Sequence, residues 1–303
     1  MSLGRYDNAQ WGKLLEPGLR KIFFDNYPEK SEQFNKVFNV NSSKKAKEYD
    51  LLLGGFAPWD NKTEKGSVTY QDPTGGHEIT YTHNSFASGF KVTREMHDDE
   101  QYNVINKMPK ALAHSGRTKV EVDAATVLNA GFDGVTRPIY DGKALFANDH
   151  VLKGGGTASN LVTGELNDAN LKLAIKCMHD APDETGNKIQ YQPKYLIVPR
   201  AKEFVAREIV GSNQKTGTDF NDINTLKGAL EVVVYDYLTN DDAWFVMDPA
   251  VAQLNFFWRV KPEFKHEEDF DTLEAKYRGY MRYSYGVSDF RGIVGSTGGA
   301  VTP

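Results

Sequence analysis

The sequence predicts a mixed helix-and-strand protein of the α+β class, in which extended segments accompany a compact unit. Three observations lead to this expectation. Residues 66–85 contain two β-favouring runs around a turn, which predicts a β-hairpin. Residues 98–129 carry apolar side chains at helical spacing, which predicts a long helix. Residues 161–250 alternate short apolar runs with amphipathic ones, which predicts a compact arrangement of strands and helices.

The first 50 residues are expected to form an irregular arm. Pro17 and Pro28 should interrupt any long helix in this segment. Large aromatic side chains are spaced among its polar residues: Trp11, Phe23, Phe24, Phe34 and Phe38. The alternative is an unstructured tail, but so many exposed aromatic side chains would be costly in a free tail. We therefore expect an arm that lies over something else.

The predicted hairpin reads GSVTYQDPTGGHEITYTHNS, with the turn at Asp72–Gly76. Both of its faces are polar or aromatic, so it shows no obvious buried side within its own chain. An isolated two-stranded hairpin is marginally stable in water. At about 3.3 Å per residue its arms would reach about 25–30 Å, and we expect them to lie on a neighbour.

The long helical pattern changes its apolar residues midway, and Pro109 and Gly116 should kink or break it. Even so it would run for about 45 Å at about 1.5 Å per residue. In the compact unit, strands are predicted at 195–199, 230–238 and 243–247. Residues 275–292 alternate tyrosines with arginines, which is typical of a half-buried strand.

Composition excludes several classes of function. The net charge is −5, so a nucleic acid would have to be held without the usual neutralisation of its phosphates. The single cysteine, Cys177, excludes an intramolecular disulfide framework and a multi-cysteine metal site, and we expect a packed thiol. No secretory signal and no window of about 18 apolar residues is visible, so we expect a soluble protein made in a reducing cytoplasm.

Residues 140–160 hold the strongest candidates for chemistry, and none is convincing. Asp149 and His150 would need a third metal ligand from elsewhere, and no two histidines stand at the i, i+4 spacing. Gly154–Thr157 lacks the lysine and the strand–loop–helix setting of a phosphate loop. Gly211–Gly217 superficially resembles such a loop, but Gln214 stands where a glycine should precede the lysine. We therefore predict no enzyme, no cofactor and no metal.

Several segments resemble the Mu-like phage major head subunits. They follow one another in the order of that family from about residue 20 to 296, and their joint order is more specific than any single segment. The segments are Asn35–Tyr49, Tyr140–His150, Gly154–Leu161, Pro193–Ser212, Glu231–Met247 and Arg282–Ser296.

The resemblance implies a Hong Kong 97-type capsid fold with an N-terminal arm, an extended β-hairpin loop, a peripheral domain with a long spine helix, and an axial domain. The implied boundaries are 1–50 for the arm, 51–92 for the extended loop, 93–160 for the spine helix and its connection, 161–250 for the axial domain and 251–303 for the strands that return to the peripheral domain. Residues 140–160 would then be a structural connection with local hydrogen bonds at Asp149 and His150.

The implied function is a major capsid protein that self-assembles into pentamers and hexamers of an icosahedral phage head around double-stranded DNA. The DNA would be enclosed without specific binding, portal and scaffolding proteins are expected partners, and a decoration protein is possible in such heads. The protein would assemble in the bacterial host cytoplasm, contact no membrane and reside in the virion capsid. Contacts between subunits are expected at Trp59, Lys62, Lys65, Tyr70 and Tyr81 in the loop, and at Trp11, Phe23, Phe24 and Phe34 in the arm.

Alternatives remain at this point. An encapsulin-like nanocompartment shell would share the fold and hold protein cargo. A metal-dependent hydrolase would use Asp149, His150 and a distant carboxylate, and a tail or baseplate protein is a third possibility. Some members of the family join loop lysines covalently to asparagines of neighbours, and Lys62 and Lys65 lie near this loop. No motif identifies the asparagine or the assisting carboxylate.

Overall fold

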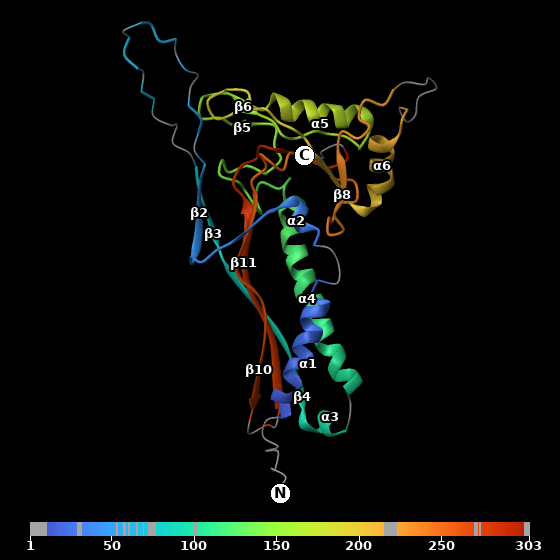
Figure 1. Cartoon of the computed structure of the whole chain (residues 1–303). Helices are drawn as coiled ribbons and strands as arrows, with labels where there is room; N and C mark the ends of the chain where they lie inside the picture. Colours follow the sequence, from blue (N-terminus) through green and yellow to red (C-terminus); the bar gives the residue numbers. More distant parts are fainter. Residues whose placement is uncertain are drawn as a thin grey trace.

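The protein is long and asymmetric in its computed structural model (Figure 1). A compact head lies at one end, a narrow stem of helices and long strands extends from it, and a loop projects beyond the head (Figure 1). The structure describes residues 11–28, 32–52, 54–56, 59, 61–64, 66–68, 70–71, 77–99, 102–214, 223–269, 272 and 274–299.

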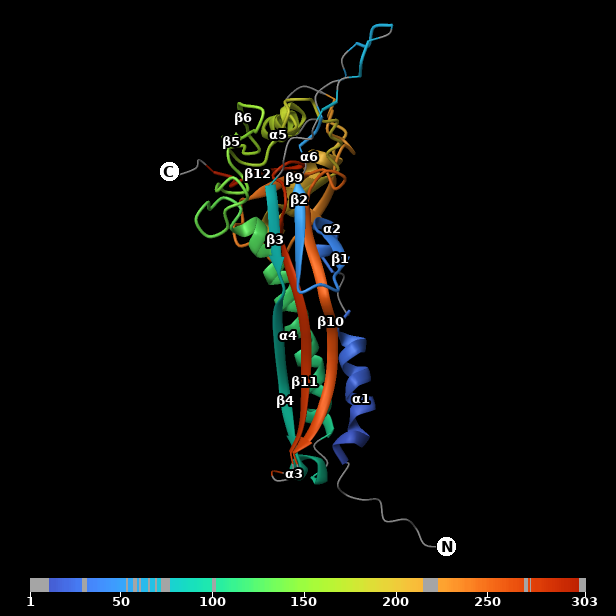
Figure 2. The ribbon, with the colours of Figure 1, turned by 90° about the vertical axis from the view of Figure 1, so that its left-hand side faces the viewer.

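The stem is built on a four-stranded sheet in the order β1-β10-β11-β4. Its central strands, β10 (Leu254–Asp269) and β11 (Glu274–Val287), are antiparallel and run most of the length of the stem (Figure 2). The edge strand β4 (Asn84–Thr93) is antiparallel to β11, and the short β1 (Asn39–Ser42) is parallel to β10. The strand predicted over 275–292 is therefore confirmed, and it ends at Val287.

Helices cover one face of this sheet. The longest is α4 (Tyr102–Asn129), accompanied by α1 (Trp11–Asn26) and the short α2 (Phe34–Val37) and α3 (Arg94–Asp98). The sheet's inward tyrosines are buried because every second residue of β11 faces these helices.

Two helices continue through prolines at which a break was expected. The long helix continues through Pro109 and Gly116, and α1 includes Pro17 within a segment that we expected to be irregular. Ile105 and Ala113 on α4 are fully buried, and Leu19 on α1 is 2% exposed. Tertiary packing of these faces outweighs a proline penalty of about 3 kcal/mol.

The second strand of the predicted hairpin pairs with a different segment than expected. Strand β3 (His77–Thr82) pairs with β2 (Lys47–Leu52), from Leu52↔His77 to Lys47↔Thr82, and not with residues 66–71. The proposed turn at Asp72–Gly76 lies outside the described residues. The β-favouring composition identified a strand, but composition carries no information about which segment pairs with it.

The head contains a second four-stranded sheet, in the order β12-β9-β7-β8. Strands β7 (Tyr195–Val198), β8 (Glu231–Val234) and β9 (Trp244–Met247) confirm the three predicted strands. The last strand, β12 (Ile293–Ser296), pairs with β9 and so belongs to the head rather than to the returning strands of the stem. The helices α5 (Asp168–Asp180) and α6 (Glu203–Gly211), the short η2 (Arg200–Lys202) and the two-residue strands β5 (His150–Val151) and β6 (Thr157–Ala158) complete it.

Three apolar clusters hold the chain together. Among the described residues, one fills the head between its sheet and helices and includes Trp244, the largest fully buried side chain. A second joins head and stem through aromatic side chains that include Phe34 and Phe256. The third lies in the lower stem, where Phe23 of α1 packs on Phe264 with ring centroids 5.1 Å apart. The arm residues Phe23 and Phe34 are thus parts of their own subunit's core.

This placement predicts a clear difference between two neighbouring phenylalanines. Phe23→Ala should lower the free energy of unfolding of the unassembled chain by about 3–5 kcal/mol, because it removes a buried ring from the lower stem. Phe24→Ala removes a ring that is 38% exposed and is expected to cost about 1 kcal/mol or less. Denaturant melts of both variants test this. Equal stabilities would contradict the assignment of α1 to the core of its own stem.

Candidate functional site

The connection between β2 and β3 carries the most exposed aromatic side chains of the described residues. Trp59 is 95% exposed and Tyr70 is 92% exposed. Together with Phe56 and Val68, which are each more than half exposed, they surround a shallow hollow of about 460 Å³. The described parts of this connection are residues 54–56, 59, 61–64, 66–68 and 70–71. They are called the projecting loop here, because they extend away from the head (Figure 1). Exposed apolar side chains gathered in this way are typical of surfaces that contact other molecules.

The head holds the start of the projecting loop. The side-chain amide of Asn187 donates a hydrogen bond to the Phe56 carbonyl over 3.2 Å. Gly55 lies so close to Asp183 that a Cβ there would be 2.9 Å from the carboxylate oxygen. On the returning strand, the His77 ring stacks on Tyr140 with centroids 4.3 Å apart. The loop therefore leaves the body from a fixed base.

A second polar cluster holds the hairpin to the stem. The Tyr81 hydroxyl lies 2.5 Å from the Ser288 Oγ, which donates to Asp50 over 2.5 Å. The Asn255 amide donates to the same Ser288 Oγ over 3.0 Å. Burial raises the pKa of the Tyr81 hydroxyl. The Tyr81 ring packs directly over Gly286. Tyr81 is only 4% exposed, so the expectation that it contacts a neighbouring subunit is corrected: it anchors the hairpin within its own subunit.

The arm residues are also engaged within the subunit. Phe23 is 3% exposed and Phe34 is 2% exposed, so their side chains are not available to a neighbour. The backbone N–H groups of Gln33 and Phe34 donate to the carboxylate of Glu121 on α4, at 2.8 and 3.1 Å. Burial raises the pKa of Glu121 while these hydrogen bonds oppose the rise. They dock the arm on the spine helix.

The remaining expected contacts divide into two groups. Phe24 and Lys62 are exposed and free to meet another molecule. Trp11 begins α1, but its side chain lies outside the described residues, as does the whole of Lys65. Sequence analysis missed Phe204, which is 74% exposed on α6 of the head. Its position within an amphipathic run gave no sign that the helix turns it outward.

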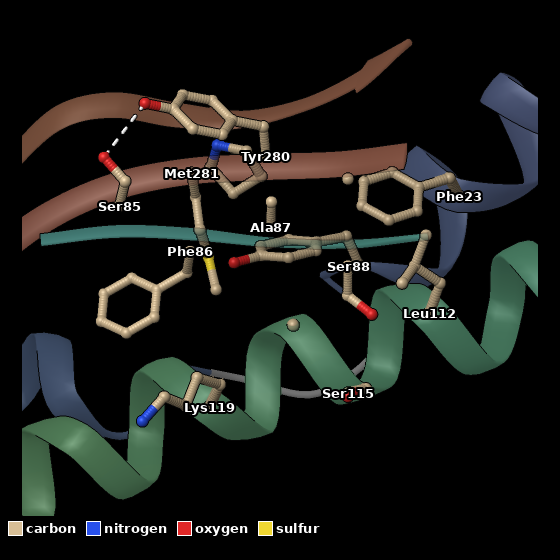
Figure 3. Close-up of a pocket in the computed structure, with 14 residues that line it drawn as sticks. Phe23, Ser85, Phe86, Ala87, Ser88, Leu112, Ser115, Lys119, Tyr280 and Met281 are labelled. Atoms are coloured by element: carbon tan, nitrogen blue, oxygen red, sulfur yellow. Dashed lines mark hydrogen bonds between the residues drawn. The ribbon is translucent and has the colours of Figure 1, made fainter. Parts of the chain in front are cut away.

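The stem contains a cavity of about 390 Å³ between α1, α4, β4 and β11 (Figure 3). Phe23, Leu112 and Met281 contribute apolar walls, and small residues such as Gly116 and Ala87 leave the space open. At its edge, the Lys119 ammonium bonds to Asp123 over 2.6 Å and lies 5.1 Å from the centre of the Phe86 ring. The lining also includes the hydroxyl groups of Ser85, Ser88, Ser115 and Tyr280, so the cavity is mixed in character.

The connection at 140–160 does not form a metal or hydrolase site. His150 is fully buried, and its Nδ1 lies 2.7 Å from Asp141 while its Nε2 lies 3.1 Å from the Asn160 Oδ1. Its ring stacks on Phe290 at 4.0 Å. Asp149 is instead exposed and pairs with Lys143. The expected local hydrogen bonds of Asp149 and His150 are confirmed. The two side chains have different partners, so they do not form the shared metal site that the hydrolase alternative requires.

A buried ionic cluster nearby escaped sequence analysis. Arg291 donates to Asp289 over 3.0 Å and to Glu184 over 3.0 Å, and all three side chains are buried. Burial raises the pKa of the Asp289 carboxyl, and the guanidinium of Arg291 opposes that rise. Because Glu184 and Arg291 stand 107 positions apart, no local pattern could have paired them. The cluster joins a head loop to the chain between β11 and β12.

The described residues contain no group of three or more His, Cys, Asp or Glu side chains arranged to hold a metal ion. Cys177 donates its thiol hydrogen to the Ser159 carbonyl over 3.1 Å, and burial raises its pKa. This confirms the packed thiol. No helix among the residues that the structure describes combines the length and the apolarity needed to cross a membrane.

The described residues combine a stem sheet covered by the long helix α4, a separate head sheet, and a loop that presents exposed aromatic rings. A family model described as phage capsid protein matches residues 78–296. The chain belongs to the phage capsid protein family. No curated protein matches the chain.

Solved structures show the same fold at low sequence identity. A chain of Microbacterium phage Oxtober96 is 14% identical with a TM-score of 0.52, covering 90% of this chain and 88% of the phage chain. The capsid of an empty GTA particle is 12% identical with a TM-score of 0.54, covering 88% and 89%. An encapsulin complex from Synechococcus elongatus is 10% identical with a TM-score of 0.54, covering 90% and 89%.

These matches confirm the Hong Kong 97-type capsid fold, and membership of the family makes this chain a major capsid shell protein of the virion. The encapsulin likeness shows only that the two kinds of shell share a fold, so the nanocompartment alternative is not favoured. The closer resemblance to Mu-like head subunits remains a prediction.

The anchoring of Tyr81 predicts a difference between two glycines of β11. A Cβ at Gly286 would lie 2.9 Å from the Tyr81 ring, whereas one at Gly279 would meet its nearest atom at 3.6 Å. Gly286→Ala should therefore destabilise the chain by about 1–3 kcal/mol, because it pushes the ring from its place. Gly279→Ala should be neutral or slightly stabilising.

Denaturant melts compare the two glycine variants. Hydrogen exchange at residues 77–83 shows whether the hairpin base loosens in Gly286→Ala alone. Faster exchange in both variants, or in neither, would contradict the proposed role of Tyr81.

Proposed function

We propose that this capsid protein assembles into pentamers and hexamers of an icosahedral head around double-stranded DNA, with the projecting loop as its main contact with a neighbouring subunit. The observation that carries the proposal is the exposure of Trp59 and Tyr70, at 95% and 92%, on a loop with a fixed base. Both residues were expected contacts from the sequence.

The energetics favour a neighbour as the partner of the loop. Burying a large apolar side chain contributes about 1.5–3 kcal/mol, and an aromatic ring adds contact area at little cost in side-chain entropy. The loop extends beyond its own head, so its rings gain this burial against another molecule (Figure 1). In a closed ring each subunit both donates a loop and receives one. Several modest contacts then act together, and closure becomes cooperative.

Other surfaces are proposed to contribute less. Phe24 and Lys62 are exposed and would lie at the margin of such contacts. For Trp11 and Lys65 a contact is proposed from the family resemblance alone. In the expected domain layout the stem is the peripheral domain and the head is the axial domain, which packs around the symmetry axes. The exposed Phe204 on α6 is an apolar side chain suited to that contact.

The contents and partners of the head are inferred from charge and from related particles. A chain with a net charge of −5 is suited to enclosing DNA without binding it tightly. The solved capsid of bacteriophage JBD30 carries minor capsid protein trimers, which supports a decoration protein as a possible partner. We also propose portal and scaffolding partners, assembly in the host cytoplasm and no catalytic role.

Removing the two loop rings tests the proposal. The double variant Trp59→Ala and Tyr70→Ala should keep the stability of the unassembled chain within about 1 kcal/mol, because both rings are exposed there. Shell formation, followed by sedimentation and negative-stain microscopy, should fall at least tenfold, because every contact loses the burial of two aromatic rings.

The matched control is Val135→Ala, which removes an apolar side chain that is 89% exposed outside the loop. This variant should assemble normally. Normal shell yields from the double loop variant would rule out the loop as the main contact. Shells that contain protein cargo and no DNA would favour the nanocompartment alternative.

A further inference from the structure

His83 lies between two consecutive strands that pair with different partner strands. Strand β3 ends at Thr82 and pairs with β2, whereas β4 begins at Asn84 and pairs with β11. His83 alone lies between these two strands. Figure 2 shows β3, which belongs to the hairpin, continuing beyond the end of β4 in the stem sheet. The backbone and contacts at this residue therefore act on the orientation of the loop together with the Tyr81 cluster and the contacts at the loop base.

The His83 ring ties three segments together. It is 4% exposed, and its Nε2 lies 3.1 Å from the Ser43 Oγ on the segment that leads into β2. Its Nδ1 lies 2.9 Å from the Ser284 Oγ on β11. Because the Ser43 hydroxyl donates its hydrogen to Glu48 over 2.6 Å, the Nε2 must donate to Ser43. The Nδ1 then accepts from Ser284, so this arrangement fits one neutral tautomer of the ring.

The charges around the ring oppose its protonation. Arg282 of β11 and Arg259 of β10 act on it as cations, and Glu48 of β2 is the facing anion. Glu48 is already bonded to Ser43 and to Lys45. Within the described residues neither arginine has an ion-pair partner, and the Nε of each is buried without a hydrogen bond. An imidazolium here would be a buried cation beside two uncompensated cations, which is costly.

We propose that His83 is a positioning residue for the assembly contact: its neutral ring holds the projecting loop in one orientation relative to the stem, and protonation in mild acid releases that orientation. The inference rests on the proposed role of the loop in contacting a neighbour. If His83 acts in this way, the orientation of the projecting loop relative to the stem depends on pH, and so does the position of its aromatic rings relative to the neighbouring subunit.

The direction of the pH dependence follows from the same contacts. Burial, and then Arg282, lower the pKa of His83 below its ordinary value, while Glu48 opposes the shift. A group with a lowered folded pKa stabilises the folded arrangement fully above its unfolded pKa, which is about 6.5 for histidine. The stabilisation is lost as pH falls from there through the folded pKa. The hydrogen bond from Ser43 lowers the pKa of Glu48, so that carboxylate stays charged over most of this window.

The test measures the loop orientation in the unassembled full-length chain. Spin labels are placed on cysteines that replace Lys62 in the loop and Lys107 on α4, in a Cys177→Ser background. At pH 7.5 the distance distribution between the labels should be narrow. On acidification it should broaden or shift, with a midpoint below pH 6.5. His83→Gln, which retains a donor toward Ser43 but cannot titrate, should show the same distribution at both ends of the range.

A matched control and a second variant complete the experiment. His97→Gln on α3 removes a histidine far from the joint and should keep the pH response of the parent chain. Arg282→Gln removes a cation facing the ring and should move the midpoint to higher pH. No response in the parent chain, or an unchanged response in His83→Gln, overturns the proposal. The labels report on unassembled chains, so this outcome is separate from normal shell yields, which would overturn the proposed function instead.

Discussion

The antiparallel pairing of β10 with β11 is the interaction on which the rest of the structure depends. It joins residues 254–269 to 274–287 along most of the stem, and β1 and β4 attach to its two sides. Its alternation places aromatic rings on one face, where the spine helix covers them. The chain after β11 then enters the head as β12. Removing this ladder would leave the helices without a surface to cover and the head without its edge strand.

The head and stem meet through a mixture of apolar packing and buried hydrogen bonds. The aromatic cluster shared by both parts supplies the burial energy, with Phe256 and Phe245 among its members. Asn160 donates to the carbonyls of Leu145, Phe290 and Ile293, and so satisfies backbone groups where three segments meet. Hydrogen bonds are directional, so they fix one orientation of the head relative to the stem. Apolar contacts alone would fix that orientation less precisely.

The base and the tip of the projecting loop carry different kinds of side chain. Its base is held by polar contacts with its own subunit, through Tyr81, His83 and the residues around Asp50. Its tip presents aromatic rings with little cover. In the proposed function, a fixed base lowers the entropy lost when the tip meets a neighbour, so the contact gains affinity without added area. Fold and assembly would then use different residues of one hairpin.

Local patterns determined the kinds of element in this protein, and the tertiary structure decided what each one touches. The strands at 195–198 and 244–247 and the long helix after residue 98 were predictable because apolar spacing is set by neighbouring residues. The exposure of Trp59 agrees with its expected place in an extended loop, which came from the family resemblance and not from a local pattern. The burial of Phe23 and Tyr81 was not predictable, since their cover comes from residues about 200 positions away. Periodicity records which face of an element is apolar, and only the folded chain decides whether its own residues or a neighbour's cover that face.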